Sequence, residues 1–175
     1  WSRGLGDVYK RQGKAVVFEG LEDLANRIDT DDLDVTKDDV LVLKSIGPKG
    51  GPGMPEAGLI PIPKKLARQG VKDMVRISDG RMSGTASGTI VLHVTPESYE
   101  NGPLAIVQDG DLIKLDVPNR RIDLKISEKE IAKRIKKKEK MSIKRRGYNK
   151  IYMEHVTQAD KGVDFDFLQA KKDDH

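Results

Sequence analysis

The apolar positions of the chain predict strands that are joined by short helices. Residues 14–19 (KAVVFE), 38–46 (DDVLVLKSI) and 73–78 (DMVRIS) are short runs rich in valine, leucine and isoleucine, which are typical of buried strands. Between the first two runs, the apolar residues of GLEDLANRI recur at helical spacing. Pro63 suits the first turn of a second helix, KKLARQ, which Gly70 ends. The first half of the chain is therefore expected to alternate between strand and helix.

The second half of the chain predicts a β-rich region followed by terminal helices. Ser127, with Glu130 three residues later, forms a capping box that begins one helix, and a second amphipathic helix is expected after Gly147. We expect His93 to pack in the core of a strand. Four runs predict strands, the last three being close enough for hairpins: residues 89–94, 103–109, 111–117 and 121–126.

Together these elements predict an α+β domain built on a barrel-like sheet, with flanking and C-terminal helices. Residues 1–12 (WSRGLGDVYKRQ) have neither period and resemble the translated adapter of a sequencing read, so we set them apart from the fold. We expect the barrel-like domain at residues 13–127 and a helical segment with a tail at residues 128–175. On this interpretation the N-terminal part of a longer protein is missing.

Composition narrows the function classes. The chain has no cysteine, so it cannot hold an iron-sulfur cluster or a thiolate zinc site with its own residues, and this suits a reducing compartment. Its apolar runs are far shorter than a membrane span of roughly 20 residues. We therefore expect a cytoplasmic protein without membrane contact.

The positive charge is concentrated in one segment. The net charge is +4, but residues 129–150 hold 11 of the 32 basic and 2 of the 28 acidic residues, which leaves 21 basic and 26 acidic residues elsewhere. A nucleic-acid-binding module is one interpretation of this segment. Aromatic residues make up only 5% of the chain and none lies between Lys129 and Gly147, so a solvated helix face is favoured.

Two glycine-rich loops follow predicted strands. The first, GPKGGPGMPEAG (residues 47–58), carries one carboxylate, Glu56, and it is either a compact connection or a close-approach loop that presents a hard oxygen ligand for Mg²⁺. One carboxylate does not make a site, so other ligands must come from substrate or another domain. The second, DGRMSGTASG (residues 79–88), offers Ser83 and Thr85, whose hydroxyls could equally cap backbone groups. Ser83 does not fit the Gly-x-Ser-x-Gly pattern of hydrolases.

Several long motifs resemble one enzyme family. GPKGGPGMPE, SDGRMSGTASG, TIVLHVTPES, NGPLAIVQDGD and RGYNKIYMEHVTQADKGVDFDFL are similar to the C-terminal part of the dihydroxy-acid and sugar-acid dehydratases, over residues 13–168. The SGTASGTIVLHVTPES motif and the ending look closer to the arabinonate and xylonate dehydratases. The resemblance implies a hydro-lyase that converts a 2,3-dihydroxy sugar acid to a 2-keto-3-deoxy acid. The alternative within the family is the dihydroxy-acid dehydratase of branched-chain amino acid biosynthesis.

The resemblance also implies cofactors, partners and residue roles. Such enzymes use Mg²⁺ and an iron-sulfur cluster held by an N-terminal domain, act as dimers or tetramers, and carry an aconitase-like swivelling C-terminal domain. By motif, Glu56 would be a magnesium ligand, Ser83 the general base that removes the C2 proton, and Thr85 a substrate-binding residue. His175 is a second substrate-binding candidate, although the short charged tail QAKKDDH favours a chain end without that role. This chain would be inactive without the N-terminal domain.

Overall fold

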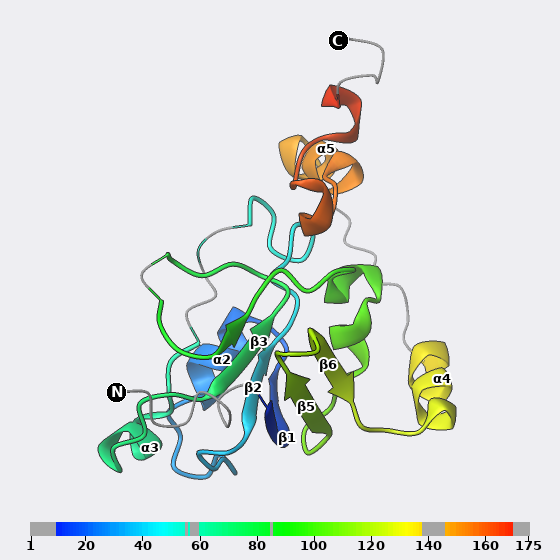
Figure 1. The fold of residues 1–175 in the computed structure, drawn as a ribbon. Coiled ribbons are helices and arrows are strands. Elements are labelled where there is room, and N and C mark those ends of the chain that lie inside the picture. Colours follow the sequence, from blue (N-terminus) through cyan, green and yellow to red (C-terminus); the bar gives the residue numbers. More distant parts are fainter. Residues whose placement is uncertain (1–9, 55, 57–59, 85, 138–145, 170–175) are drawn as a thin grey trace.

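The fold is a mixed six-stranded sheet in the computed structural model, which describes residues 10–54, 56, 60–84, 86–137 and 146–169 (Figure 1). The order across the sheet is β4-β3-β2-β1-β5-β6. Neighbours from β4 to β1 are parallel, whereas β5 pairs antiparallel with both β1 and β6. The strands are β1 (Lys10–Phe18), β2 (Val40–Leu43), β3 (Val75–Ser78), β4 (Ile90–Val91), β5 (Leu112–Asp116) and β6 (Arg121–Leu124).

β1 joins the two halves of this sheet. Its first five residues pair with β5, and the four residues from Ala15 to Phe18 pair with β2. The strand begins at Lys10, so residues 10–12 belong to the sheet although their sequence has no strand period. The edge strands β4 and β6 do not meet, which leaves an open, curled sheet (Figure 1). The predicted mixture of α and β structure is confirmed, with a half-barrel in place of a closed one.

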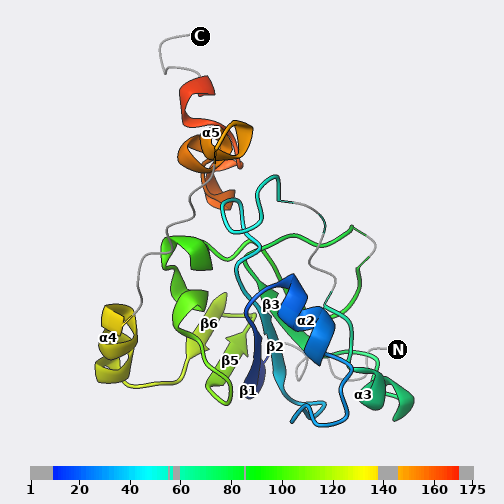
Figure 2. The same ribbon diagram turned by 180° about the vertical axis from the view of Figure 1, so that it is seen from behind.

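Two apolar clusters lie on opposite faces of the sheet. Successive residues of β1 alternate between them, because side chains of a strand point to opposite faces: Val16 and Phe18 belong to one cluster, and Ala15 and Val17 to the other. The first cluster is covered by α2 (Leu21–Arg27) and α3 (Lys64–Arg68), the helices expected from sequence. Figure 2 shows α2 in front of this face. Residues 15–18 of β1 and all of β2 are thus buried on both sides, as central strands of a parallel sheet usually are.

The strand expected at residues 103–109 is wrong. Residues Pro103–Ile106 form a 3-10 helix, η2, in which Leu104 and Ala105 are buried. A short apolar run does not distinguish a buried strand from a buried helix. A Cβ atom on Gly102 would lie 1.5 Å from the carbonyl oxygen of Pro96, so the chain turns tightly at a point that only glycine allows.

The strand expected at residues 89–94 is also shorter than predicted. β4 contains only Ile90 and Val91, and the chain then leaves the sheet. His93 is exposed and has a left-handed backbone with φ of 56°, while its backbone N–H donates to the carbonyl of Gly80 at 3.2 Å. The expectation that His93 packs in the core is therefore wrong, because the backbone at this point follows the second glycine-rich loop instead of the strand.

The helix α4 (Glu128–Lys137) contains the first part of the basic segment and begins as predicted, with the N–H of Glu130 donating to the Ser127 hydroxyl at 3.2 Å. Arg134 turns inward and donates to the carbonyl of Ile106 at 3.0 Å and to the carboxylate of Asp111. This residue therefore attaches α4 to the domain through structural contacts.

The C-terminal unit projects from the sheet beyond the glycine-rich loops (Figure 1). It contains α5 (Tyr148–His155) and two 3-10 helices, η3 (Ala159–Lys161) and η4 (Asp166–Leu168). Tyr152, Met153 and Val156 form its small buried cluster. The described helices are all too short or too polar to cross a bilayer.

Candidate functional site

The two glycine-rich loops leave the carboxyl ends of neighbouring parallel strands. The first loop follows β2 and the second follows β3, and these strands are in direct register, with Leu43 opposite Ser78. In open sheets with parallel strands, ligands bind outside the carboxyl ends of the strands. The topology therefore brings the two loops to one edge of the sheet (Figure 1).

Asp79 ties the beginning of both loops together. Its backbone opens the second loop, and its buried carboxylate accepts hydrogen bonds from the backbone N–H of Ser45 at 3.2 Å and of Ile46 at 3.1 Å, just before the first loop. The same carboxylate accepts the N–H of Ser98 at 2.8 Å. Gly80 then packs against Ile46 so closely that a Cβ atom would lie 2.4 Å from its Cδ1 atom. The two loops consequently start from a shared, rigid base.

Glu97 fills the inside of the first loop. Its carboxylate is fully buried and accepts the backbone N–H of Lys49 at 2.9 Å and of Gly50 at 2.8 Å. The side-chain amide of Gln158 donates to it at 2.7 Å, and the N–H of Glu97 donates back to the Gln158 carbonyl at 2.8 Å. Gly47 permits this approach, since a Cβ atom there would lie 2.7 Å from the carboxylate. The glycines of the loop therefore wrap an internal anion and link it to the C-terminal unit.

The electrostatics of Glu97 reflect two opposing effects. Burial raises the pKa of Glu97, and the hydrogen bonds from Gly50, Gln158 and Lys49 oppose this rise while the nearby charge of Asp79 adds to it. Tyr152 of α5 also contacts the first loop through a hydrogen bond with the backbone of Gly53, and burial raises its pKa.

The far ends of both loops are held by one arginine. Arg76 of β3 is buried and donates to the carbonyl of Ser87 at 2.5 Å, near the end of the second loop. It also donates to the carbonyl of Ile60, just after the first loop, at 3.4 Å. Asp73, which lies 3.5 Å from this guanidinium, accepts the N–H of Thr89 at 2.9 Å. Buried charged groups therefore anchor the loops at both ends.

Glu56 and Arg81 connect the tips of the two loops. Arg81 Nη2 lies 2.6 Å from Glu56 Oε1, and the two side chains are 45% and 49% exposed. Ser83 lies two residues after Arg81 and is half-buried, and its carbonyl accepts the N–H of Ala86 at 3.0 Å in a turn. Thr85 and His175, the two predicted substrate-binding residues, lie outside the described residues.

The donor set fits a metal only as part of a larger site. Glu56 presents a half-exposed carboxylate that already faces a cationic group, which suits a hard oxygen ligand for Mg²⁺. In the part of the chain that the structure describes, three or more His, Cys, Asp or Glu side chains do not come together as a metal site. Among the described residues, Glu56 is thus a single carboxylate at the loop tips, and a metal ion bound there would need further ligands from outside them.

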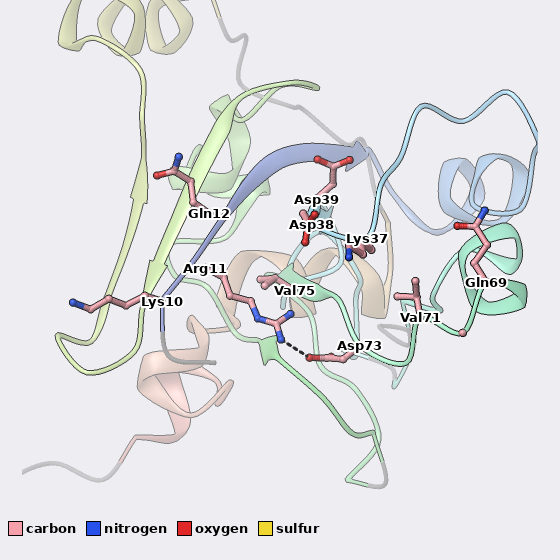
Figure 3. A pocket seen from close by; sticks show the side chains of 11 residues that line it. Lys10, Arg11, Gln12, Lys37, Asp38, Asp39, Gln69, Val71, Asp73 and Val75 are labelled. Carbon is pink, nitrogen blue, oxygen red and sulfur yellow. Dashed lines mark ion pairs between the residues drawn. The ribbon is translucent and has the colours of Figure 1, made fainter. Parts of the chain in front are cut away.

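A cavity of about 660 Å³ lies at a different place (Figure 3). It is lined by residues at the start of β1, such as Arg11, and by residues that precede β2 and β3, such as Asp38 and Asp73. These are the amino ends of the parallel strands, on the side away from the glycine-rich loops. Figure 3 shows Arg11 directed at Asp73, 3.5 Å away. We therefore do not assign this cavity to the site at the loop tips.

Sequence reasoning singled out Glu56 and Ser83 but missed the groups that position them. Glu97 is 48 residues from Lys49, whose N–H donates to it, Arg76 is 16 residues from Ile60, to whose carbonyl it donates, and the pairing of Arg81 with Glu56 spans 25 residues. One signal was available for Glu97, because a loop with several glycines exposes backbone N–H groups that need an acceptor when they are buried.

Comparison with known sequences agrees with the motifs. The pattern described as dihydroxy-acid/6-phosphogluconate dehydratase C-terminal matches residues 4–163. This chain belongs to the dihydroxy-acid/6-phosphogluconate dehydratase family. Membership of this dehydratase family favours the enzyme interpretation over a nucleic-acid-binding module.

Individual relatives of this dehydratase family are similar over nearly the whole chain. L-arabinonate dehydratase of Rhizobium leguminosarum bv. trifolii (strain WSM2304) is 48% identical over 160 residues, which is 91% of this chain and 28% of that protein. 6-deoxy-6-sulfo-D-gluconate dehydratase of Pseudomonas putida is 48% identical over 162 residues, 92% of this chain and 28% of the relative. Dihydroxy-acid dehydratase of Pyrococcus abyssi (strain GE5 / Orsay) is 42% identical over 163 residues, 92% of this chain and 29% of the relative. The chain thus spans less than a third of the length of these relatives.

Proposed function

We propose that this chain is the C-terminal part of a dehydratase that removes water from a 2,3-dihydroxy sugar acid and yields a 2-keto-3-deoxy acid. Family membership supports the reaction class. The sugar-acid substrate is favoured because two relatives named for sugar acids are 48% identical, against 42% for a relative named dihydroxy-acid dehydratase.

The observation that carries the proposal is the contact between the loop tips. Glu56 and Arg81 meet at 2.6 Å, and Ser83 follows Arg81 by two residues. A carboxylate, a guanidinium and a hydroxyl therefore belong to one edge of the sheet, on backbone that buried side chains hold in place. Such preorganised groups suit a site that takes a proton from a small acid.

The reaction assigns distinct tasks to the residues of the second loop. Ser83 Oγ, as an alkoxide, takes the proton from C2 and the C3–O bond breaks. The departing hydroxide takes up the proton that Ser83 removed and leaves as water, which restores the alkoxide. The enol that remains rearranges to the 2-keto acid. Serine is a weak base, so its alkoxide needs nearby positive charge and backbone N–H donors, and the glycine-rich loop can supply the donors. Thr85 and His175 remain candidates for binding the substrate.

The family implies cofactors and a partner domain that complete the site. When bound, Mg²⁺ at Glu56 and an iron-sulfur cluster in the N-terminal part would supply Lewis acidity toward the carboxylate end and the departing hydroxyl. The half-barrel would then act as the aconitase-like swivelling domain over that part, in a cytoplasmic homo-oligomer.

The proposal is tested with the full-length enzyme and three acids: L-arabinonate, 6-deoxy-6-sulfo-D-gluconate and a branched-chain 2,3-dihydroxy acid. We expect 2-keto-3-deoxy product from a sugar acid, and a loss of at least about 10³-fold in turnover for Ser83→Ala. Glu56→Ala is expected to abolish turnover with the fold intact by circular dichroism. Ser87→Ala, an exposed serine of the same loop, is the matched control and should retain turnover.

The turnover assays distinguish the two substrate classes and test the roles of Ser83 and Glu56. Turnover of the branched-chain acid alone would replace the sugar-acid substrate by the alternative of the family. Normal turnover in both Ser83→Ala and Glu56→Ala would reject the proposed roles.

A further inference from the structure

We propose that Arg81 binds the carboxylate of the acid substrate, and that Glu56 holds this guanidinium as long as the site contains no acid. The inference rests on the proposed function, because it needs an acid substrate and a metal ligand at Glu56. In this inference Glu56 has two alternative partners, the metal ion of the proposed function and the guanidinium of Arg81.

Arg81 is the available cation of the two loops. The loops contain only two basic residues, Lys49 and Arg81. Lys49 Nζ is 2.7 Å from Glu100 and its side chain is only 21% exposed, so this lysine is already paired and largely buried. The nearby Arg76 is buried and bound to backbone carbonyls. Of Lys49, Arg76 and Arg81, only Arg81 has a half-exposed charged group that lies at the loop tips, where it pairs with Glu56.

The ion pair of Arg81 is easy to exchange. Both side chains are about half exposed, and solvent-exposed ion pairs contribute only about 0–1 kcal/mol. The backbone, in contrast, is fixed on both sides of Arg81: Gly80 packs on Ile46, and Met82 is buried. The guanidinium can therefore change partners while its Cα position is kept.

The sequence spacing of Arg81 and Ser83 is short enough for both residues to reach one 2-hydroxy acid. The reacting C2 atom is bonded directly to the carboxylate carbon, so a group that holds the carboxylate must lie close to the base. Two residues along a chain separate Cα atoms by at most about 7 Å, which the long arginine side chain readily spans. Arginine also has the planar pair of N–H donors that matches a carboxylate, and lysine lacks this match.

A second consequence concerns the metal. If Glu56 is a magnesium ligand, Arg81 and Mg²⁺ compete for the same carboxylate. Removal of the guanidinium should then strengthen metal binding in the absence of acid and weaken binding of the acid. A residue that only stabilises the loop would not produce these opposite effects.

The test uses the full-length holoenzyme with Arg81→Gln, Arg81→Lys and the control Lys49→Gln, which removes one positive charge from the other loop. For Arg81→Gln we expect KM for the acid to rise by about 10- to 100-fold, because charge-assisted hydrogen bonds to the carboxylate are lost, with a smaller change in kcat. Arg81→Lys should recover part of the KM, and Lys49→Gln should stay within about twofold of the wild type.

The second measurement is a titration with Mn²⁺ without substrate, followed by electron paramagnetic resonance. Arg81→Gln should bind Mn²⁺ about two- to fivefold more tightly than the wild type. A KM within threefold of the wild type, or Mn²⁺ affinity that is unchanged or weaker, would overturn the inference. Absence of wild-type turnover on every acid would instead overturn the proposed function, and the Mn²⁺ titration would still decide whether Arg81 competes for Glu56.

Discussion

Replacement of Glu97 by alanine removes the acceptor around which the first glycine-rich loop is built. The carboxylate is fully buried and accepts two backbone N–H groups, those of Lys49 and Gly50, at 2.9 and 2.8 Å. The amide of Gln158 donates to it at 2.7 Å. In Glu97→Ala these three donors keep their buried positions and lose their acceptor.

The expected cost follows from these three donors. A buried donor without a partner costs about 1–3 kcal/mol, and water admitted to the vacated space recovers part of this. We therefore expect the free energy of unfolding to fall by about 3–5 kcal/mol, the lower part of the roughly 3–9 kcal/mol that three such donors would cost together. Such a loss is a large fraction of the stability of a typical domain.

The assay is urea unfolding of the 175-residue chain followed by circular dichroism, with hydrogen exchange at the amides of Lys49 and Gly50. Glu100→Ala is the matched control, because Glu100 pairs with the side chain of the same lysine in a partly exposed ion pair. That variant should lose less than about 1 kcal/mol. If Glu97→Ala loses less than about 1.5 kcal/mol and both amides stay protected, the loop is not organised around this carboxylate.

Two other predictions concern pH and α4. Burial raises the pKa of Glu97 above its ordinary value of 4.5, so the folded state binds this proton more readily, and stability from the group is lost as pH rises from 4.5 through the folded pKa. Urea unfolding at stepped pH should show wild type losing stability over this window relative to Glu97→Gln, and parallel profiles would contradict the assignment. Arg134→Gln removes the contacts with Ile106 and Asp111, so the free energy of unfolding should fall by about 2–4 kcal/mol and α4 amides should exchange faster. The exposed Lys133→Gln is its control, and equal exchange in the two variants would refute the anchoring role.

Sequence patterns over a few neighbouring residues predicted those helices and strands that depend mainly on neighbouring residues. The helical spacing of Leu24 and Ile28 corresponds to α2, whose buried face these residues form. Ser127 caps α4 as expected, because a cap depends only on residues three positions apart. Strands β2 and β3 and residues 14–18 of β1 were predicted from their apolar runs, which are buried in the sheet, whereas residues 10–13 of β1 were not predicted.

The elements that the sequence did not predict depend on contacts between distant residues. The apolar run after Gly102 became a 3-10 helix, because the chain there passes against Pro96. The same limit applies to the site. Glu56 and Ser83 were singled out by their loops, but the residues that hold these loops lie elsewhere in the chain: Glu97 is 48 residues from the Lys49 amide that it accepts. Tertiary contacts of this kind leave little trace in local composition.

The central claim is that the two loop tips serve one site for a small acid. The most direct measurement is a crystal structure of the full-length enzyme with a bound, unreactive analogue of the sugar acid. We predict that Ser83 Oγ contacts C2 of the analogue, and that Glu56 contacts a metal ion bound to the same molecule. An analogue bound at the loop tips with Ser83 and Glu56 facing different molecules, or bound at the amino ends of the strands, would contradict the account.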